Sequence, residues 1–404
     1  MGWTWRWARP MAYAAVAIAG GFLVVRTLIA LHESLGGGTA VDYLGMASAA
    51  RLVAAGSHCV YCPAHLAAAQ SALLGYTPPP GSAFPIPFVS PAVLAWLLQP
   101  LAALPLQTGT DILVLAGVAA MAVAATLLIR YLRPATVMPI AGGVVVAFVF
   151  SLGAATGILL GQIDGILLLC ATASLLLLER RHPWWAGILL APLLLKPQLL
   201  WLAVPALLLS SQWRTSVPVL AGGAAVAVGG LLLVGTSHVL DVVGAVGTAT
   251  YHQLNAQGNT LPELFARPLG SDAAGWVAAA AGAALAVAAM AWQRKRLRAH
   301  PAEALAVGLA ASVALSPHLG DYSLMLLAVP VVVLARRRPM AGATVAAVFT
   351  ASTLVPFPGQ RVTSLVALTL LASFAWAVRL ALAAAAPDRT PATAPRSMVT
   401  AHAR

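Results

Sequence analysis

Long apolar runs separated by short polar stretches dominate the pattern along this chain of 404 residues. A run of about 20 apolar residues is long enough to cross the hydrocarbon core of a bilayer as a helix. The pattern predicts twelve spans, several of them short, at residues 11–31, 109–129, 136–156, 158–178, 184–196, 197–211, 216–235, 274–292, 303–316, 322–335, 339–355 and 361–385. It therefore predicts an all-α polytopic membrane protein.

A further apolar stretch, residues 88–106, is interrupted by Pro91, Pro100 and Pro105. A stretch of this kind can form a short span, giving about 13 spans in all. It can also form a re-entrant segment, which is tolerated where surrounding protein shields the backbone from lipid.

Composition supports the membrane class. Hydrophobic residues make up 60% of the chain and charged residues only 8%, whereas about 25% of the residues of a soluble domain are charged. A water-soluble protein is therefore excluded. The net charge of +12 would suggest nucleic acid as a partner in a soluble protein, but here its distribution has another explanation.

The basic residues fall mainly on one side of the predicted topology. Of 23 Lys and Arg residues, 18 lie in one set of loops and four in the other, and Arg26 lies within the first span. Cytoplasmic loops carry the excess of Lys and Arg, so we expect both termini on the cytoplasmic side of a cell membrane. The same count favours a re-entrant 88–106, and it gives no reason to expect a nucleic-acid partner.

The predicted topology leaves one transmembrane domain, residues 1–386. Residues 32–87 form a long first outer loop with juxtamembrane helices, and the Ala-, Pro- and Thr-rich residues 387–404 are expected to be a disordered cytoplasmic tail. The outer loops are longer and chemically more varied than the inner ones, and loops of this kind commonly carry function.

Asp42 is the first candidate for chemistry. It lies just after the first span, where we expect a helix from about residue 41 to residue 55 on the membrane surface. Partial desolvation there would raise its proton affinity and suit a general base. Asp42 could instead cap that helix, and one residue can do both.

Lys196 and the Gly161-Gln162-Ile163-Asp164 turn form a second group at the outer ends of spans. A charge inside a membrane usually faces a cavity or pairs with a counter-charge, and Lys is a good partner for phosphate. We expect Asp164 to pair with Lys196. Gln198 follows Lys196 by two residues and is a further polar candidate in this group. The alternatives are a lysine snorkelling to the headgroups and a plain turn between spans.

Two more outer segments carry polar groups. His318 and Asp321 are three residues apart, so a helical turn would place them on one face, where they could bind phosphate or move a proton. The loop 250–259 contains His252 and Asn255 and is rich in groups that can hydrogen-bond sugar hydroxyls. An interfacial helix start and an ordinary polar loop are the alternatives.

Cys59 and Cys62 lie in an outer loop between His58 and His65. A local disulfide is the preferred interpretation, because exposed thiols oxidise outside the cytoplasm. A tetrahedral zinc site is the alternative. Cys170 lies inside a span and is expected to pack among apolar side chains. No phosphate loop, nucleophile elbow or metalloprotease motif occurs.

Several motifs, taken in order, resemble those of one family. They are Asp42-Tyr43 with residues 49–56, residues 87–94, residues 99–105, Gly161-Gln162-Ile163-Asp164, Trp185-Ala186-Gly187, Leu195-Lys196-Pro197-Gln198, residues 255–259 and Leu315-Ser316-Pro317-His318. Together they cover roughly residues 40–320, and the chain resembles the polyprenol-phosphate-mannose-dependent mannosyltransferases of glycosyltransferase family 87. That family often has Asn where this chain has Asp164.

The resemblance implies a GT-C type fold and a mechanism. A polyprenyl-phosphate-linked mannose would donate its sugar to a glycolipid or glycan acceptor on the outer face, with inversion. Asp42 would be the base, and Lys196 and His318 would hold the donor phosphate. Gln162, Asp164, Gln198, His252, Asn255 and Asp321 would contact the sugar or the acceptor. No metal or other cofactor is expected.

Two alternatives remain open from the sequence. The same scaffold would suit an arabinosyl donor on a polyprenyl phosphate. A lipid or sugar transporter or flippase would also contain intramembrane polar residues and proline-broken helices.

Overall fold

A computed structural model describes residues 3–37, 40–79, 84–133, 138–238, 240–246, 260, 272–316 and 319–354. Within these ranges the chain forms helices joined by loops, with no strand, which confirms the all-α prediction. The predicted span 361–385, the tail 387–404 and the candidates His252, Asn255 and His318 lie outside these residues.

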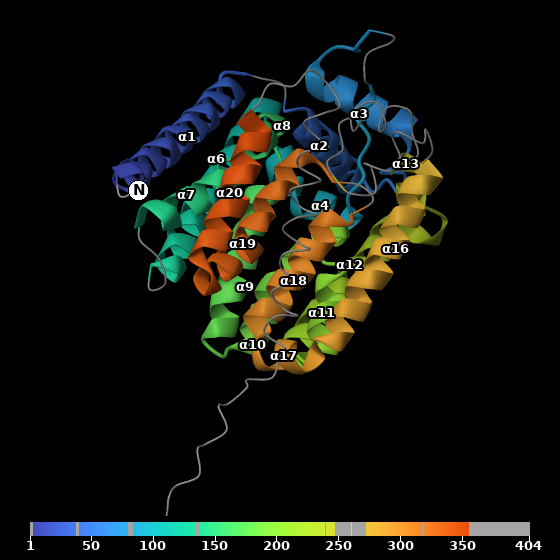
Figure 1. The fold of residues 1–404 in the computed structure, drawn as a ribbon. Helices are drawn as coiled ribbons and strands as arrows, with labels where there is room; N and C mark the ends of the chain where they lie inside the picture. The colour runs from blue at the N-terminus through green and yellow to red at the C-terminus, as the bar shows by residue number, and fades with distance from the viewer. Residues whose placement is uncertain are drawn as a thin grey trace, which may run out of the picture.

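The described elements are α1 (Trp3–Leu35), α2 (Val41–Ala54), α3 (Pro63–Leu74), α4 (Ala92–Leu97), α5 (Gln99–Ala102), α6 (Leu106–Leu132), α7 (Met138–Val149), α8 (Leu152–Leu160), α9 (Asp164–Glu179), α10 (Pro183–Leu190), the 3₁₀ helices η1 (Ala191–Leu195) and η2 (Pro197–Leu199), α11 (Ala203–Leu209), α12 (Trp213–His238), α13 (Asp241–Val246), α16 (Asp272–Trp292), α17 (Arg294–Ala299), α18 (Pro301–Ala314), the 3₁₀ helix η3 (Asp321–Leu327), α19 (Ala328–Arg337) and α20 (Pro339–Leu354). Figure 1 shows α2, α3 and α4 at one end of the molecule and α10 and α17 at the other.

Four of the described helices are long and apolar enough to cross a membrane. They are residues Ala17–Leu35 of α1, the whole of α6 and α12, and Ala273–Trp292 of α16. The protein is therefore a polytopic membrane protein. The other apolar runs form shorter or broken helices, such as Pro183–Leu195 and Pro301–Ala314.

The predicted span 136–156 does not form one straight helix. Helices α7 and α8 meet at a 41° bend, where α7 ends at Val149 and Ser151 is the N-cap of α8. Its hydroxyl oxygen accepts a hydrogen bond from the backbone N–H of Ala154 at 3.2 Å, which is the usual N-cap contact. The following predicted span, 158–178, is likewise divided, since α8 ends at Leu160 and α9 begins at Asp164.

The proline-rich stretch 88–106 forms two short helices, α4 and α5, of six and four residues. Neither is long enough to span a bilayer. Pro91 is the N-cap of α4 and Pro105 that of α6. These breaks occur where proline removes a backbone donor and disfavours a helical residue before it.

Helix α2 was expected to lie on the membrane surface, but it lies inside the protein. Every residue from Tyr43 to Ala50 is buried, and α2 packs against α3, α4 and α5. Gly45 leaves room for Ile86, whose side chain would lie 3.2 Å from a Cβ at position 45. Asp42 is therefore held by the body of the protein.

The helical conformation is interrupted at Lys196, between η1 and η2. Its backbone angles, φ −132° and ψ 79°, are not helical. Pro197 accounts for this conformation, because a proline disfavours the α region in the residue before it. Helix α10 with η1 leads to Lys196, and η2 with α11 leads away from it.

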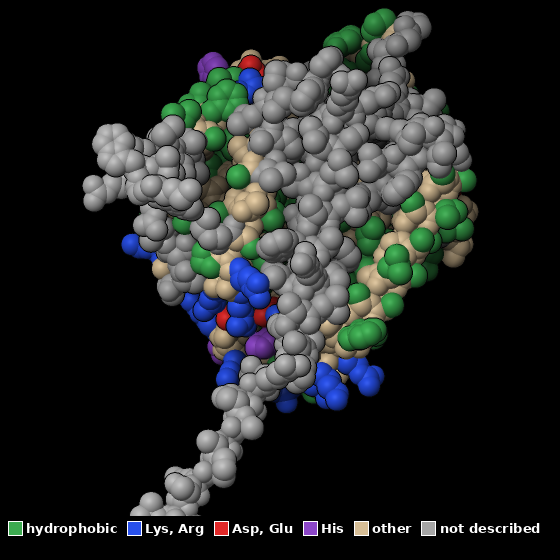
Figure 2. Space-filling view, viewed as in Figure 1, with side chains coloured by type: hydrophobic (Ala, Val, Ile, Leu, Met, Phe, Trp, Pro, Cys, Tyr) green, Lys and Arg blue, Asp and Glu red, His purple; other side chains and the backbone are tan. Residues whose placement is uncertain are grey.

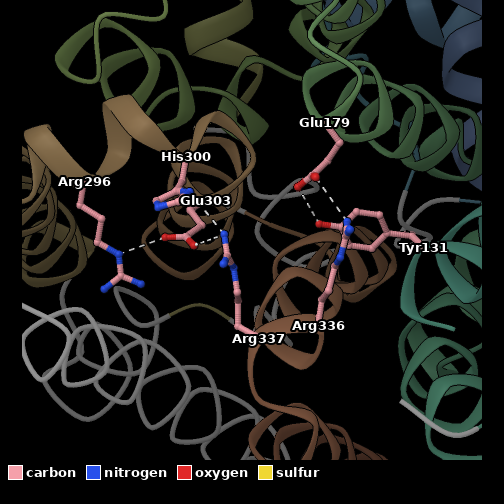
Figure 3. Close-up of polar contacts among 7 residues, drawn as sticks. All are labelled: Tyr131, Glu179, Arg296, His300, Glu303, Arg336 and Arg337. Carbon is pink, nitrogen blue, oxygen red and sulfur yellow. Dashed lines mark hydrogen bonds and ion pairs between the residues drawn. The ribbon is translucent and has the colours of Figure 1, made fainter. Parts of the chain in front are cut away.

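The end of the molecule opposite α2 is held by two groups of ion pairs (Figure 3). Glu303 contacts Arg296 at 3.1 Å and Arg337 at 3.2 Å. These contacts connect α17, α18 and the C-terminal end of α19, so Glu303 joins three elements with one carboxylate.

The second group joins α6, α9 and α19 around Glu179. Glu179 accepts a hydrogen bond from the Tyr131 hydroxyl at 2.9 Å and contacts Arg336 at 3.3 Å. The Arg336 guanidinium also lies 4.1 Å from the centre of the Tyr131 ring, a cation–π distance.

Gly161 determines how closely α2 approaches the end of α8. Its φ is +71°, and a Cβ at this position would lie 2.8 Å from the Cβ of Tyr43 and 3.1 Å from that of Ala40. A larger residue would therefore strain the backbone and push α2 away.

We expect Gly161→Ala to lower the free energy of unfolding by about 2–5 kcal/mol. The left-handed conformation costs a non-glycine residue about 1–2 kcal/mol, and overpacking adds about 1–3 kcal/mol. Melting in detergent micelles, followed by circular dichroism, measures the change. Gly142→Ala in α7 is the matched control, since a Cβ there meets nothing within 4 Å. Equal melting temperatures for the two variants would contradict this account of Gly161.

Candidate functional site

Asp42 lies in the first turn of α2, and its side chain does not cap the helix. The N-cap is Ala40, with no side-chain cap hydrogen bond. Instead, the Asp42 carboxylate accepts a hydrogen bond from the side-chain amide of Gln162. The capping interpretation of Asp42 is therefore wrong, and the carboxylate is directed at residues 120 positions away along the chain.

Gln162 lies in the short turn between α8 and α9 and bridges two charges. Its Nε2 donates to Asp42, and its Oε1 accepts a hydrogen bond from Lys196 Nζ at 2.6 Å. A carboxylate can only accept and an ammonium can only donate, so these two neighbours determine which way the amide points. One amide therefore connects Asp42 with Lys196.

Lys196 also forms the predicted ion pair with Asp164, at 2.5 Å between Nζ and Oδ2. Lys196 is 7% exposed and Asp164 is 0% exposed, so the snorkelling alternative does not describe this lysine. Removing one partner of a buried ion pair leaves an uncompensated charge, which typically costs about 3–5 kcal/mol. The second carboxylate oxygen of Asp164 accepts a hydrogen bond from Ser323 Oγ at 2.6 Å.

Two of these contacts come from η3, which the sequence did not single out. Ser323 bonds Asp164, and the ring of Tyr322 lies 4.5 Å from Lys196 Nζ, at a cation–π distance. Glycines on α8 allow η3 to approach, since a Cβ at Gly157 would lie 2.8 Å from the Cβ of Tyr322. The Asp-Tyr-Ser sequence at 321–323 was the only available signal, and no spacing rule connects it with Lys196.

The site contains two carboxylates and one lysine. Asp164 contacts Lys196 directly, whereas Asp42 is connected to it only through Gln162. Burial raises the pKa of Asp42 above its ordinary value, because a desolvated carboxylate is less stable when charged. The hydrogen bond from Gln162 and the positive charge of Lys196 lower this pKa, and the negative charge of Asp164 raises it. Burial prevails, so Asp42 has a greater proton affinity than an exposed aspartate.

The other candidates are less closely connected with this group. Asp321 begins η3, and its backbone packs against the position of Gly153 on α8. Gln198 lies in η2, two residues after Lys196, and is partly exposed. His252, Asn255 and His318 lie outside the described residues.

Cys59 and Cys62 form the predicted local disulfide. Among the described residues, the histidine whose ring nitrogen lies within 4.8 Å of both sulfurs as part of one group is His238, whereas the zinc alternative expected His58 and His65. His58 bonds the backbone oxygen of Leu233 at 3.0 Å, which connects this loop to α12. The structure thus gives the disulfide loop a place against the end of α12.

A model of one protein family matches the chain. The family is glycosyltransferase family 87, and the match covers residues 88–317, more than half of the chain. No curated protein and no solved structure matches. The matched residues include Gln162, Asp164 and Lys196, and Asp42 precedes them. With its membrane helices, this chain is a membrane glycosyltransferase and belongs to glycosyltransferase family 87.

Proposed function

We propose that the protein transfers a mannosyl unit from a polyprenyl-phosphate donor to a hydroxyl group of a glycolipid or glycan. The transfer inverts the configuration at the anomeric carbon. It takes place on the outer side of a cell membrane, where Asp42 is proposed to lie. The observation that carries this proposal is the hydrogen-bonded connection from Asp42 through Gln162 to Lys196. It places a candidate base and a candidate phosphate ligand one amide apart.

Asp42 is the general base in this scheme. The acceptor hydroxyl gives its proton to the Asp42 carboxylate oxygen that does not contact Gln162, while the hydroxyl oxygen attacks the anomeric carbon. The bond from that carbon to the phosphate oxygen breaks, and its electron pair leaves with the polyprenyl phosphate. The raised pKa of Asp42 supports the assignment, because a base with greater proton affinity accepts the proton more readily.

Lys196 binds the donor phosphate in this scheme. Two of its three ammonium protons are used by Gln162 and Asp164, which leaves one for a phosphate oxygen. Positive charge close to the bridging oxygen stabilises the negative charge that develops there as the bond breaks. His318 is proposed as a second phosphate ligand.

Gln162 and Asp164 have supporting roles in the proposal. Gln162 orients the carboxylate of Asp42, and Asp164 holds the Lys196 ammonium in place with Ser323 on its other oxygen. Gln198, His252, Asn255 and Asp321 remain proposed contacts for the sugar or the acceptor.

Membership of a glycosyltransferase family favours an enzyme over the transporter alternative. The mannosyl and the arabinosyl donor both contain a polyprenyl phosphate and differ in the shape of the sugar. Assay of purified protein with both polyprenyl-phosphate sugars decides it, and transfer from the arabinosyl donor alone would overturn the mannosyl assignment.

We expect Asp42→Asn to lower kcat by about 10²–10⁴-fold, the usual contribution of a general base, with little change in KM for the donor. Asp111→Asn is the matched control, because Asp111 is a partly buried carboxylate bonded to Gln107 in α6. Initial rates of sugar transfer in detergent or nanodiscs measure both. Near-normal turnover by Asp42→Asn would refute the base assignment.

We expect activity to fall as the pH drops through the pKa of Asp42, because only the deprotonated carboxylate accepts a proton. Gln162→Met removes a hydrogen bond that stabilises the charged form, so the acidic limb should move to higher pH by about one unit, equivalent to about 1.4 kcal/mol. A kcat–pH profile for both proteins tests this. An acidic limb at the same pH in both would argue against Asp42 as the titrating group.

Lys196 can be tested for phosphate binding separately from stability. Lys196→Met alone should lower the melting temperature, since it leaves Asp164 buried and unpaired. The double variant Lys196→Met/Asp164→Asn should restore most of the melting temperature, because Asn can still accept the bond from Ser323. The double variant should nevertheless keep a donor KM raised by about 10–100-fold, the loss of one charged hydrogen bond. A normal donor KM in the double variant would mean that Lys196 is structural only.

A further inference from the structure

A group of exposed aromatic and basic side chains lies at the end of the molecule opposite α2. The Trp184 and Trp213 rings meet edge to face with centres 6.0 Å apart, joining α10 to α12. The Arg214 guanidinium lies 5.3 Å from the centre of a Trp213 ring. Arg298 of α17 donates to Ser211 Oγ at 2.6 Å. We call Trp184, Trp213, Arg214 and Arg298 the tryptophan–arginine patch.

The two tryptophans of the patch are exposed on the surface of the protein. Trp184 is 45% exposed and Trp213 is 55% exposed, although each contacts the other. In a membrane protein, tryptophan is enriched where the hydrocarbon core meets the headgroups, with its ring apolar and its N–H polar. The patch therefore lies at the level expected for lipid headgroups.

No carboxylate among the described residues neutralises the positive charge of the patch. The carboxylates of the described residues at this end are Glu179 and Glu303, and both are already paired with arginines of α17 and α19 (Figure 3). Arg214 and Arg298 form no ion pair within the described part of the chain and are exposed. Figure 2 shows Lys and Arg side chains gathered at this end.

An apolar surface continues from the patch along α12 toward the middle of the membrane. Val217 is 44% exposed and Leu220 is 50% exposed; Val217 follows Trp213 by four residues and Leu220 follows Val217 by three, so all three lie on one face of the helix. Ile188, four residues after Trp184 on α10, is also exposed. The two helices pack together, so their exposed residues form adjacent stripes.

We propose that the tryptophan–arginine patch is a binding site for an acidic phospholipid of the adjoining leaflet. Arg214 and Arg298 bind the phosphate, since guanidinium groups donate paired hydrogen bonds to phosphate oxygens. The tryptophans lie at the level of the glycerol esters, and the acyl chains lie along the exposed stripes of α10 and α12. Net negative charge on the headgroup is required, because a choline would place a cation beside two arginines.

This site is distinct from the candidate catalytic group, but it lies on the same structural element. Helix α10 begins at Pro183 beside the patch and continues through η1 to Lys196. A lipid bound between α10 and α12 would contact the N-terminal end of α10. The continuation of α10 through η1 ends at Lys196. The inference does not rest on the proposed donor or acceptor.

The test is lipid binding by the full chain in detergent micelles, measured by native mass spectrometry. Phosphatidylglycerol and phosphatidylcholine with identical acyl chains are the two probes. A charged hydrogen bond from an arginine to a phosphate oxygen is worth roughly tenfold in affinity, so Arg214→Gln/Arg298→Gln should weaken phosphatidylglycerol binding by about 100-fold.

Arg130→Gln/Arg133→Gln is the matched control, with the same charge change at the end of α6, which packs against α9 and α7. In neutral detergent micelles it should leave phosphatidylglycerol binding within about twofold of wild type, less than the loss of one charged hydrogen bond to the headgroup. Equal losses in both double variants, or equal binding of the two lipids by wild type, would overturn the proposal.

A second measurement covers the aromatic part of the site. Brominated phosphatidylglycerol in nanodiscs should quench tryptophan fluorescence more than brominated phosphatidylcholine, and Trp184→Phe/Trp213→Phe should remove that difference. A difference that persists in this variant would place the bound lipid elsewhere and refute the site.

Discussion

The buried ion pair between Lys196 and Asp164 is the contact on which the rest of the site depends. An unpaired charge in a low-dielectric interior is costly, and Lys196 is almost fully buried. Asp164 neutralises it, Ser323 satisfies the other oxygen of Asp164, and Gln162 connects the pair to Asp42. Each neighbour is satisfied by the next, so α2, the α8–α9 turn, the break at Lys196 and η3 are held in one arrangement.

The helical breaks explain how so polar a group can lie within an apolar protein. Pro197 ends the helix at Lys196, Gly161 ends α8 with a left-handed residue, and η3 is a 3₁₀ segment. At each break the side chains can converge on a common point, whereas a continuous helix would distribute them along its length. Non-helical backbone is tolerated at membrane depth only where protein or a cavity surrounds it.

The sequence predicted the class of the protein and part of the site. Apolar runs and charge asymmetry gave a polytopic helical protein, and the rarity of intramembrane charges led to Asp164 and Lys196 as a pair. The buried position of α2 was not predicted, because its burial depends on α3, α4 and α5. Tyr322 and Ser323 were missed for the same physical reason, since 159 residues separate Ser323 from Asp164 and no local spacing records their contact. The bend at Ser151 was missed because both sides of it are equally apolar.

The order of these residues along the chain has a consequence for how the protein is made. Asp164 emerges during synthesis 32 residues before Lys196, and Ser323 emerges last. Until Lys196 arrives, Asp164 has no lysine beside it, and an isolated charged side chain is strongly disfavoured in lipid. Stable burial of Asp164 therefore waits for the docking of Lys196, which makes it a late event of membrane insertion. A chain truncated between these two residues would contain the acid without its counter-charge.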